Sequence, residues 1–399
     1  MALDKPHWLH LFKEVVTSGL CTGCAGCVIA CPHDVLRYDD SNGVYKPFKI
    51  EADGGFDNCT HGEKGCTMCT RACPRFRTWE EECDNYLFGR QRTIEEVAGV
   101  SSEIILARAS DPEINKMGQD GGLVSALLIW ALENDIVDAA LLSYTPNSAA
   151  TPHADNIPPP DIRTHYLPNT DSAGSFAGRS QKAIPLVAHN RRDVLKAIGS
   201  RYTYSTNPLG YFEAVQDGAE RLALVGMGCQ SSAPAIMSAR KAGKVARRFV
   251  LNIGLLCSKT FDETVFPQFF EQRYKVKEEQ ISKINIKGVF QVWTTDGSYQ
   301  EIPLKEAYAW TRDGCKACPD FAAQHADISA GGIGTFENWT LLIIRTQTGR
   351  QTIDGAVTAG MIETRPVDDD PNALKTLNKL SRISRKRWPA DAITGPGLI

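Results

Sequence analysis

Short apolar runs separated by polar segments recur along the chain from about residue 100 onward. Residues 101–109, 137–144, 222–225 and 249–256 each form an apolar run of strand length. Runs of about four to eight apolar residues between polar turns are typical of strands that are buried on both faces. The apolar residues 122–132 predict a buried helix, and a further stretch at residues 194–198 continues the alternation. The pattern therefore predicts an α/β domain.

The remaining segments depart from this central pattern. Residues 8–16 carry apolar side chains near helical spacing and predict a short amphipathic lead-in, whereas residues 146–161 contain five prolines and predict a loop or lid. Residues 374–388 predict a basic helix, which is either a solvated face or a surface that holds an acidic partner. We expect four segments, with boundaries at residues 1–90, 91–180, 181–370 and 371–399.

Composition narrows the class of protein. The 399 residues suffice for two or three domains, and the net charge of −3 gives no electrostatic reason to expect nucleic-acid binding. The longest apolar run, residues 122–132, is shorter than the ~20 residues of a membrane-spanning helix, so no transmembrane segment is expected. Thirteen cysteines, in a chain whose start lacks a charged-then-apolar signal segment, indicate a reducing, cytoplasmic setting.

Eight of the cysteines form two similar runs near the amino terminus. In each run the last three cysteines are separated by two and then three residues and are followed by proline, as in bacterial ferredoxins with two iron–sulfur clusters. In such runs the fourth cysteine binds the other cluster. This rule assigns one [4Fe–4S] cluster to Cys21, Cys24, Cys27 and Cys73, and a second cluster to Cys31, Cys59, Cys66 and Cys69. The alternatives are zinc binding or buried structural cysteines, but zinc modules seldom repeat this spacing. Cys83 lies outside both runs.

Four further cysteines follow predicted strands or form a chelating pair. Cys229 and Cys257 come at the carboxyl ends of two predicted strands, where α/β sheets build their sites, and Cys315 and Cys318 are separated by two residues. Spacing alone leaves two interpretations open. The four thiols hold a third cubane, or they are unrelated buried cysteines beside a redox-active or zinc-binding pair.

A pair of glycines opens the predicted apolar helix. Gly121 and Gly122 leave backbone amides bare at the positive end of this helix, an arrangement that suits a phosphate or the edge of a flavin ring. Many helices begin after glycines for packing reasons, so the signal is weak by itself. A dehydrogenase that binds NAD is disfavoured, because no Gly-x-Gly-x-x-Gly motif follows a strand.

Several motifs in order give the chain a family resemblance over roughly residues 100–370. They are Ala107 to Glu113, Gln119-Asp120-Gly121-Gly122, Gly199 to Asn207, Gly228-Cys229-Gln230, Leu256-Cys257, Gly314 to Asp320, Ala326 to Ser329, Asn338-Trp339-Thr340 through Thr346, and Gly360 to Pro366. The chain resembles the family of coenzyme F420 hydrogenase and dehydrogenase beta subunits, which includes the plant 7-hydroxymethyl chlorophyll a reductases.

The resemblance implies an α/β flavoprotein domain preceded by an α+β dicluster ferredoxin-like domain. It implies that Cys229, Cys257, Cys315 and Cys318 hold a third [4Fe–4S] cluster and that FAD lies between two segments. The residues expected at the FAD are Gln119, Asp120, Gly121, Gly122, Arg201, Tyr202, Thr203, Ser205 and Asn207. Lys116 and Arg201 either hold the FAD pyrophosphate or tune the reduced flavin, or they are ordinary solvated charges.

The fused dicluster unit resembles the input subunits of archaeal deazaflavin dehydrogenases more than the plant reductases. The expected activity is an oxidoreductase that transfers hydride from reduced coenzyme F420 to FAD. Single electrons then pass through the clusters to a ferredoxin or a larger redox complex. Two alternatives remain: a ferredoxin-dependent reductase of an organic substrate, and a non-catalytic electron-transfer subunit.

Overall fold

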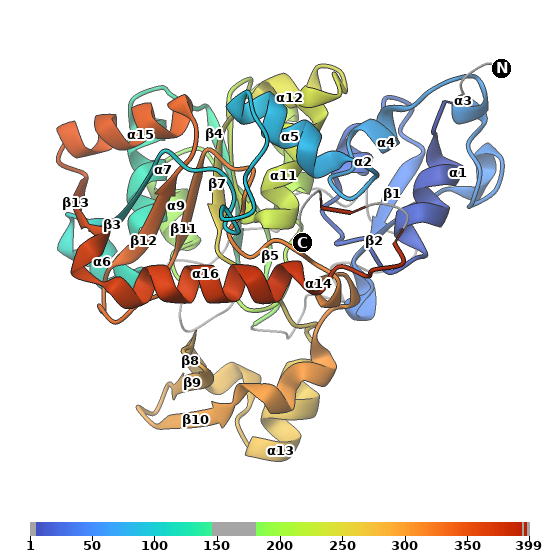
Figure 1. Ribbon diagram of the computed structural model, residues 1–399. Coiled ribbons are helices and arrows are strands. Elements are labelled where there is room, and N and C mark those ends of the chain that lie inside the picture. The colour runs from blue at the N-terminus through green and yellow to red at the C-terminus, as the bar shows by residue number, and fades with distance from the viewer. Residues whose placement is uncertain (1–4, 146–180, 393–394, 397–399) are drawn as a thin grey trace.

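The central element of the protein is an eight-stranded sheet, seen in a computed structural model that describes residues 5–145, 181–392 and 395–396 (Figure 1). The predicted loop at residues 146–161 lies outside the described residues. The strand order is β13-β3-β12-β11-β7-β6-β4-β5. The strands are β3 (Glu103–Ala109), β4 (Ala139–Tyr144), β5 (Ile184–Ala188), β6 (Leu222–Met227), β7 (Phe249–Leu255), β11 (Ile328–Gly331), β12 (Thr340–Ile344) and β13 (Ile362–Pro366).

The middle of this sheet is parallel and its two sides are antiparallel. β4, β6, β7 and β11 run in the same direction, whereas β5 on one side and β12, β3 and β13 on the other are joined by antiparallel pairings. Because parallel strands share one carboxyl edge, the segments that follow β4, β6, β7 and β11 all leave the sheet on the same side. The predicted α/β architecture is confirmed.

Helices cover both faces of the sheet, which explains why its strands read as continuous apolar runs. In β12, Leu342 and Ile344 belong to the same buried cluster as residues of α7 (Leu123–Glu133) and α15 (Gln347–Thr358) on one face, whereas Leu341 and Ile343 belong to a cluster with residues of α16 (Pro371–Arg385) on the other. Figure 1 shows α16 running across one face of the sheet. The helices of this domain are α6 (Pro112–Met117), α7 (Leu123–Glu133), α9 (Arg191–Lys196), α10 (Tyr211–Gln216), α11 (Gly228–Ala239), α12 (Val245–Arg248), α14 (Asp313–Lys316), α15 (Gln347–Thr358) and α16 (Pro371–Arg385).

The amino-terminal unit packs against this domain through a shared apolar core. Trp8, Leu11 and Val28 belong to the same buried cluster as Leu141 and Leu224 of the sheet, so the two units are not separated by solvent. The helix α5 also packs along α11. The elements of the unit are α1 (Trp8–Leu11), a π-helical turn (Phe12–Val16), α2 (Gly26–Ile29), β1 (Leu36–Asp39), β2 (Lys46–Lys49), α3 (Thr60–Glu63), α4 (Met68–Arg71) and α5 (Trp79–Phe88). The predicted amphipathic lead-in is therefore helical.

A small lobe extends from the main body and was not predicted from the sequence (Figure 1). It consists of an antiparallel sheet of β8 (Ile281–Ile286), β9 (Val289–Thr294) and β10 (Tyr299–Pro303), with α13 (Gln272–Tyr274) beside it. Phe266, Phe269, Phe270 and Phe290 form a separate aromatic core for this lobe. Strand β8 of this lobe contacts both segments that were predicted to bind the flavin.

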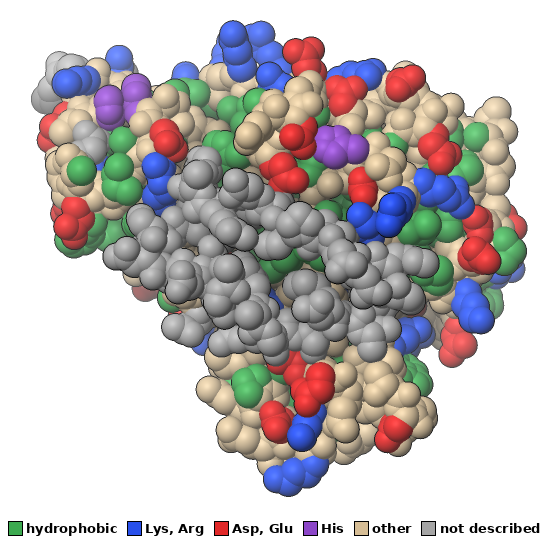
Figure 2. Space-filling model, turned by 180° about the vertical axis from the view of Figure 1, so that it is seen from behind, with side chains coloured by type: hydrophobic (Ala, Val, Ile, Leu, Met, Phe, Trp, Pro, Cys, Tyr) green, Lys and Arg blue, Asp and Glu red, His purple; other side chains and the backbone are tan. Residues whose placement is uncertain are grey.

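In the part of the chain that the structure describes, no helix is both long and apolar enough to cross a membrane. Figure 2 shows Lys and Arg side chains intermingled with Asp and Glu side chains over the visible part of the face opposite to Figure 1. That face therefore carries charges of both signs side by side.

Candidate metal centres and cofactor site

Two of the predicted metal-binding cysteines lie side by side at the carboxyl edge of the parallel strands. In the β6–β7 pair, Met227 is the partner of Leu255, and Cys229 and Cys257 each follow two residues after these paired positions. The equal offset takes both thiols past the end of the sheet to the same side. Cys229 lies in the first turn of α11, and Cys257 lies in the loop after β7.

Cys315 and Cys318 reach the same place from α14 and the turn that follows it. The backbone amide of Cys257 donates to the carbonyl of Phe321 (2.9 Å), which ties this turn to the end of β7. Burial raises the pKa of Cys257 well above its ordinary value, and the charges of Cys315, Cys229 and Cys318 add to the rise. The structure thus brings together the four thiols of what is called here the third set: Cys229, Cys257, Cys315 and Cys318.

A second group, the inner set, lies in the amino-terminal unit and contains Cys21, Cys24, Cys27 and Cys73. All four side chains are buried. Burial raises the pKa of Cys24 to about 12, and the charges of Cys73 and Cys21 add to the rise. Burial also raises the pKa of Cys27, with Cys24, Cys73 and Cys21 as its strongest charged neighbours. Cys73 therefore joins the first three cysteines of the other run, as the crossover rule expects.

The last group, the outer set, contains Cys31, Cys59, Cys66 and Cys69. Burial raises the pKa of Cys69, and the charges of Cys31, Cys66 and Cys59 are among the contributions that add to the rise. Cys31, Cys66 and Cys69 are partly exposed, in contrast to the buried inner set. Cys83 joins none of the three groups, because it is fully buried in α5 among apolar side chains.

The inner set lies between the other two. Cys27 has Cys69 of the outer set among its charged neighbours, and Cys229 of the third set has Cys24. Packing agrees with this order, since α2, which carries Cys27, lies between α4 and α11. A methyl group added to Gly26 of α2 would lie 2.8 Å from the carbonyl oxygen of Ala72 and 3.2 Å from the Cβ of Ala233.

Among the residues that the structure describes, no group of three or more His, Cys, Asp or Glu side chains is placed to hold one ion. Tetrahedral zinc requires four ligands that converge to about 2.3 Å from one centre when they are thiolates. Thiolates that bind the corners of a cubane stand farther apart, so a cluster does not require this convergence.

Close backbone contacts join the inner and third sets. Any side chain at Gly314, one residue before Cys315, would clash with the carbonyl of Cys21. Arg312 donates through Nη2 to the carbonyl of Thr22 (3.1 Å). These contacts fix the distance between the two groups, and spacing along the chain gave no sign of them.

Tyrosines and a threonine fill the same interface. The Tyr38 hydroxyl donates to the carbonyl of Gly23 (2.6 Å) and accepts from the Thr206 hydroxyl (2.9 Å). The Tyr204 hydroxyl lies 3.9 Å from Sγ of Cys229. The segment that carries Thr206 and Tyr204 therefore contacts both the inner set and the third set.

The predicted glycine pair is required by local packing. Gly121 and Gly122 have φ values of 94° and 68°, which favour glycine. A side chain at Gly121 would clash with the carbonyl of Asn338, and one at Gly122 would clash with the carbonyl of Ile114. Gly122 is the residue before α7, and no side chain caps this end of the helix. The first turn of α7 therefore offers uncapped backbone amides.

The two segments predicted to hold the flavin meet at the small lobe. Gln119 donates through Nε2 to Oδ1 of Asn285 on β8 (3.0 Å), and the Tyr202 hydroxyl donates to the same oxygen (3.4 Å). Asp120, beside Gln119, packs against Gly332 in the segment after β11. Asn285 was not predicted, because it lies in a segment without a family motif.

Three predicted residues hold their own segment in place. Thr203 donates to the carbonyl of Gln181 (2.9 Å), and the Ser205 hydroxyl donates to Oδ1 of Asn207 (2.7 Å). Asn207 donates through Nδ2 to the carbonyl of Val225 on β6 (2.7 Å). Thr203, Ser205 and Asn207 are buried, so their side chains position the segment at the carboxyl edge of the sheet.

The two predicted cations differ in their surroundings. Lys116 is exposed in the last turn of α6. Arg201 donates through Nη1 to the carbonyls of Ala197 and Gly199 (both 2.6 Å). Burial lowers the pKa of Arg201 to about 10, and no carboxylate forms an ion pair with it among the described residues. Arg201 is thus a partly buried positive charge that an anion would stabilise.

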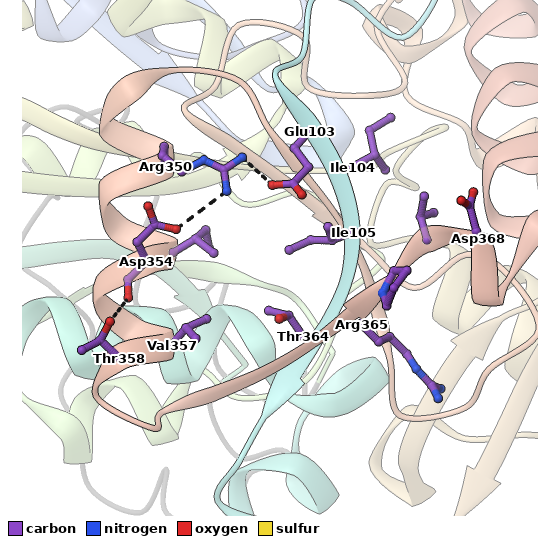
Figure 3. A pocket seen from close by; sticks show the side chains of 13 residues that line it. Glu103, Ile104, Ile105, Arg350, Asp354, Val357, Thr358, Thr364, Arg365 and Asp368 are labelled. Carbon is purple, nitrogen blue, oxygen red and sulfur yellow. Dashed lines mark hydrogen bonds and ion pairs between the residues drawn. The ribbon is translucent and has the colours of Figure 1, made fainter.

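A groove at the outer edge of the sheet contains none of the predicted residues (Figure 3). It lies between β3, β13 and α15. Arg350 on α15 pairs with Glu103 of β3 and approaches Asp354 (3.7 Å), so these three charged side chains of the groove pair with one another. The groove is distinct from the cysteine sets and from the segment around Gln119.

Comparison with known protein families gives three matches. Residues 219–370 match the carboxyl-terminal part of the coenzyme F420 hydrogenase/dehydrogenase beta subunit, and residues 104–152 match the amino-terminal part of the same subunit. Residues 20–76 match a 4Fe-4S dicluster domain, which confirms the predicted ferredoxin-like domain.

Individual relatives match over most of the chain. The coenzyme F420 hydrogenase subunit beta of Methanothermobacter thermautotrophicus is 32% identical over 300 residues, which cover 73% of this chain and 94% of the relative. One subunit of the F(420)H(2) dehydrogenase of Methanosarcina mazei is 25% identical over 380 residues, which cover 94% of this chain and 91% of the relative. A solved chain from the F420-reducing NiFe hydrogenase complex of Methanosarcina barkeri superposes with a TM-score of 0.62 at 27% identity, covering 73% of this chain and 91% of that chain.

Proposed function

Because the chain belongs to the family of coenzyme F420 hydrogenase and dehydrogenase beta subunits, we propose that it transfers electrons between reduced coenzyme F420 and a redox partner protein. Two of its relatives are named for an F420 hydrogenase and an F(420)H(2) dehydrogenase. The observation that carries the proposal is the row of three cysteine sets. This row leads from the carboxyl edge of the α/β domain into the ferredoxin-like domain.

In this proposal each cysteine set holds one [4Fe–4S] cluster. The order third set, inner set, outer set is supported by the neighbours of Cys229, Cys24, Cys27 and Cys69. The buried inner set suits a relay that is shielded from solvent, whereas the partly exposed outer set suits electron exchange with a protein docked at the surface. The partner is a ferredoxin or a larger oxidoreductase complex.

The proposal also requires FAD beside the third set. When bound, FAD supplies the conversion between a two-electron hydride transfer and the one-electron transfers that iron–sulfur clusters carry out. Two features of the chain suit it: the uncapped amides at the start of α7, and the partly buried charge of Arg201, which lacks a carboxylate partner among the described residues. Gln119 and Tyr202, joined through Asn285, hold the two segments together on the side of the small lobe.

The central test of this function compares hydride donors. The anaerobically purified chain should contain flavin, and reduced F420 should bleach its absorbance, whereas NADH at the same concentration should not. A chain that binds no flavin after reconstitution would support the alternative of a non-catalytic electron carrier. Equal bleaching by NADH would exclude a specific role for F420.

The two predicted cations give a matched pair for the flavin site. Arg201→Gln removes a partly buried charge and is expected to weaken flavin binding by about ten- to a hundredfold, as for a lost charged hydrogen bond worth ~1.5–3 kcal/mol. Lys116→Gln changes an exposed side chain, so flavin affinity should stay within about twofold, as expected for a solvated charge. Flavin titration of the apoprotein, followed by fluorescence quenching, measures both. Equal effects of the two variants would contradict the assignment of Arg201.

A further inference from the structure

Two arginine side chains are buried between the inner and third cysteine sets. Arg75 follows Cys73 by two residues and places Nη2 3.5 Å from Sγ of Cys318. Arg312 precedes Cys315 by three residues and donates to the carbonyl of Thr22 in the inner set's loop. Only 1% of Arg75 and 4% of Arg312 is exposed. Arg75 thus follows the inner set in the chain and contacts the third set, whereas Arg312 precedes the third set and contacts the loop of the inner set.

Both guanidinium groups have nitrogens that lack protein partners. Nε of Arg75 and both Nε and Nη1 of Arg312 are buried without an acceptor among the described residues. No carboxylate lies within ion-pair distance of either group in that part of the chain, although Asp320 faces Arg75 from farther away. Burying a charge without a counter-charge costs several kcal/mol, so these two cations are expected to face negative charge that the protein alone does not supply.

Aromatic rings fix the orientation of both side chains. The Arg75 guanidinium lies 4.5 Å from the centre of the Trp79 ring. The Arg312 guanidinium lies 3.5 Å from the centre of the Tyr204 ring and 4.7 Å from that of Tyr45. These contacts hold the two cations in place at the interface between the cysteine sets.

The hydrogen bonds of the two guanidinium groups point to the same two sets. Arg75 donates through Nη1 to the carbonyl of Pro74 beside the inner set and places Nη2 near Cys318, and Arg312 donates to the carbonyl of Thr22. The outer set lies beyond the inner set as seen from the third set.

We propose that Arg75 and Arg312 raise the reduction potentials of the clusters held by the inner and third sets, and leave that of the outer set unchanged. The inference rests on the proposed function, since it requires clusters in these sets. An electron that enters either site adds one negative charge next to two fixed positive charges, which stabilise it. Hydrogen bonds from the unpartnered nitrogens to cluster sulfur act in the same direction.

Two sites with raised potentials match the number of electrons in one hydride. One hydride from reduced F420 carries two electrons, and each cluster accepts one. Raised potentials favour reduction of the inner and third sites, which together have room for the two electrons of one hydride. The outer site then passes electrons to the partner one at a time.

The test measures cluster potentials directly and needs no F420. Arg75→Met and Arg312→Met are compared with Arg75→Lys and Arg312→Lys, which keep the charge, and with Arg71→Met, which removes an exposed charge on α4. Iron content is checked first, and the reduced fraction of each cluster is then followed by electron paramagnetic resonance during titration with dithionite and redox mediators. Each Met variant should lower the reduced-to-oxidised ratio of two clusters at least tenfold at fixed potential, which is ~59 mV for a one-electron couple. The Lys variants and Arg71→Met should shift it less than about threefold.

Unchanged potentials in an iron-replete Met variant, or equal shifts of all three clusters, would overturn the proposal. If a Met variant does not retain its iron, Asp320→Asn decides, because removing this negative neighbour of Arg75 should raise the potential of the third cluster. No rise in Asp320→Asn would also overturn it. A chain with three clusters that does not oxidise reduced F420 refutes the proposed function alone, since the potentials are measured without that substrate.

Discussion

Replacing Cys66 with alanine is expected to slow electron delivery to a ferredoxin-type acceptor strongly while reduction of the flavin by reduced F420 continues. Cys66 belongs to the outer set, the farthest group from the third set in the observed order. It is partly exposed, so its replacement disturbs little packing. Without the outer cluster the electron must cross a longer gap to the partner, and the rate of acceptor reduction should fall at least about tenfold.

Iron analysis on the same samples makes this result interpretable. The unaltered chain should hold about twelve iron atoms after anaerobic reconstitution, and Cys66→Ala should fall toward about eight, as expected when one of three four-iron clusters is lost. Cys83→Ala is the matched control: this thiol is buried among Trp79, Ala235 and Ile236, so iron content should not change. If Cys66→Ala stops flavin reduction as well, the outer set is not the exit. An unaltered chain with about eight irons would remove the third cluster from the proposal.

The sequence predicted the cysteine groups because ligand spacing is a local property. The two-and-three-residue spacing places thiols around a short turn, and the proline after each run ends it. The strands β6 and β7 were predicted because burial on both faces leaves continuous apolar runs in the sequence. Since parallel strands share a carboxyl edge, Cys229 and Cys257 could be placed together without a structure.

Features that depend on tertiary contacts were not predictable. The roles of Arg75 and Arg312 arise where two segments more than 200 residues apart meet, and nothing in the local sequence distinguishes them from surface arginines. The same holds for Gly121, whose close contact is with Asn338. The small lobe did leave a signal in the sequence, namely Gly288 and Gly297, which stand between its strands. Both adopt the positive φ that is typical of glycines in hairpin turns.

The basic side chains of the carboxyl-terminal helix α16 fall into an exposed group and a buried one. Lys375, Lys379, Arg382 and Lys386 of the predicted stretch are at least partly exposed, in agreement with a solvated face. Arg385 is buried and forms an ion pair with Glu80 of α5. The helix therefore fastens the α/β domain to the ferredoxin-like domain, and this function was invisible in the sequence.

Glu80→Gln is expected to lower the free energy of unfolding by about 3–5 kcal/mol, the usual cost of breaking a buried ion pair. The carboxylate is 2% exposed and binds Arg385 through both oxygens, at 2.9 and 3.0 Å, with Arg92 at 3.2 Å. Glutamine keeps the shape but removes the charge that two buried guanidinium groups face. Glu14→Gln breaks the more exposed pair with Arg77 (3.0 Å) and should cost no more than about 1 kcal/mol.

The loss of stability caused by Glu80→Gln is expected to become smaller at acidic pH. Burial alone raises the pKa of Glu80, but the charges of Arg92 and Arg385 outweigh burial and hold the pKa below its ordinary value of 4.5. A carboxylate with a lowered pKa contributes its full stabilisation above pH 4.5 and loses it as the pH falls through the lowered value. Urea unfolding of both proteins, measured anaerobically with intact clusters, should therefore show a constant difference near neutral pH that shrinks below pH 4.5. A loss no larger than that of Glu14→Gln would show that Glu80 does not join the two domains energetically.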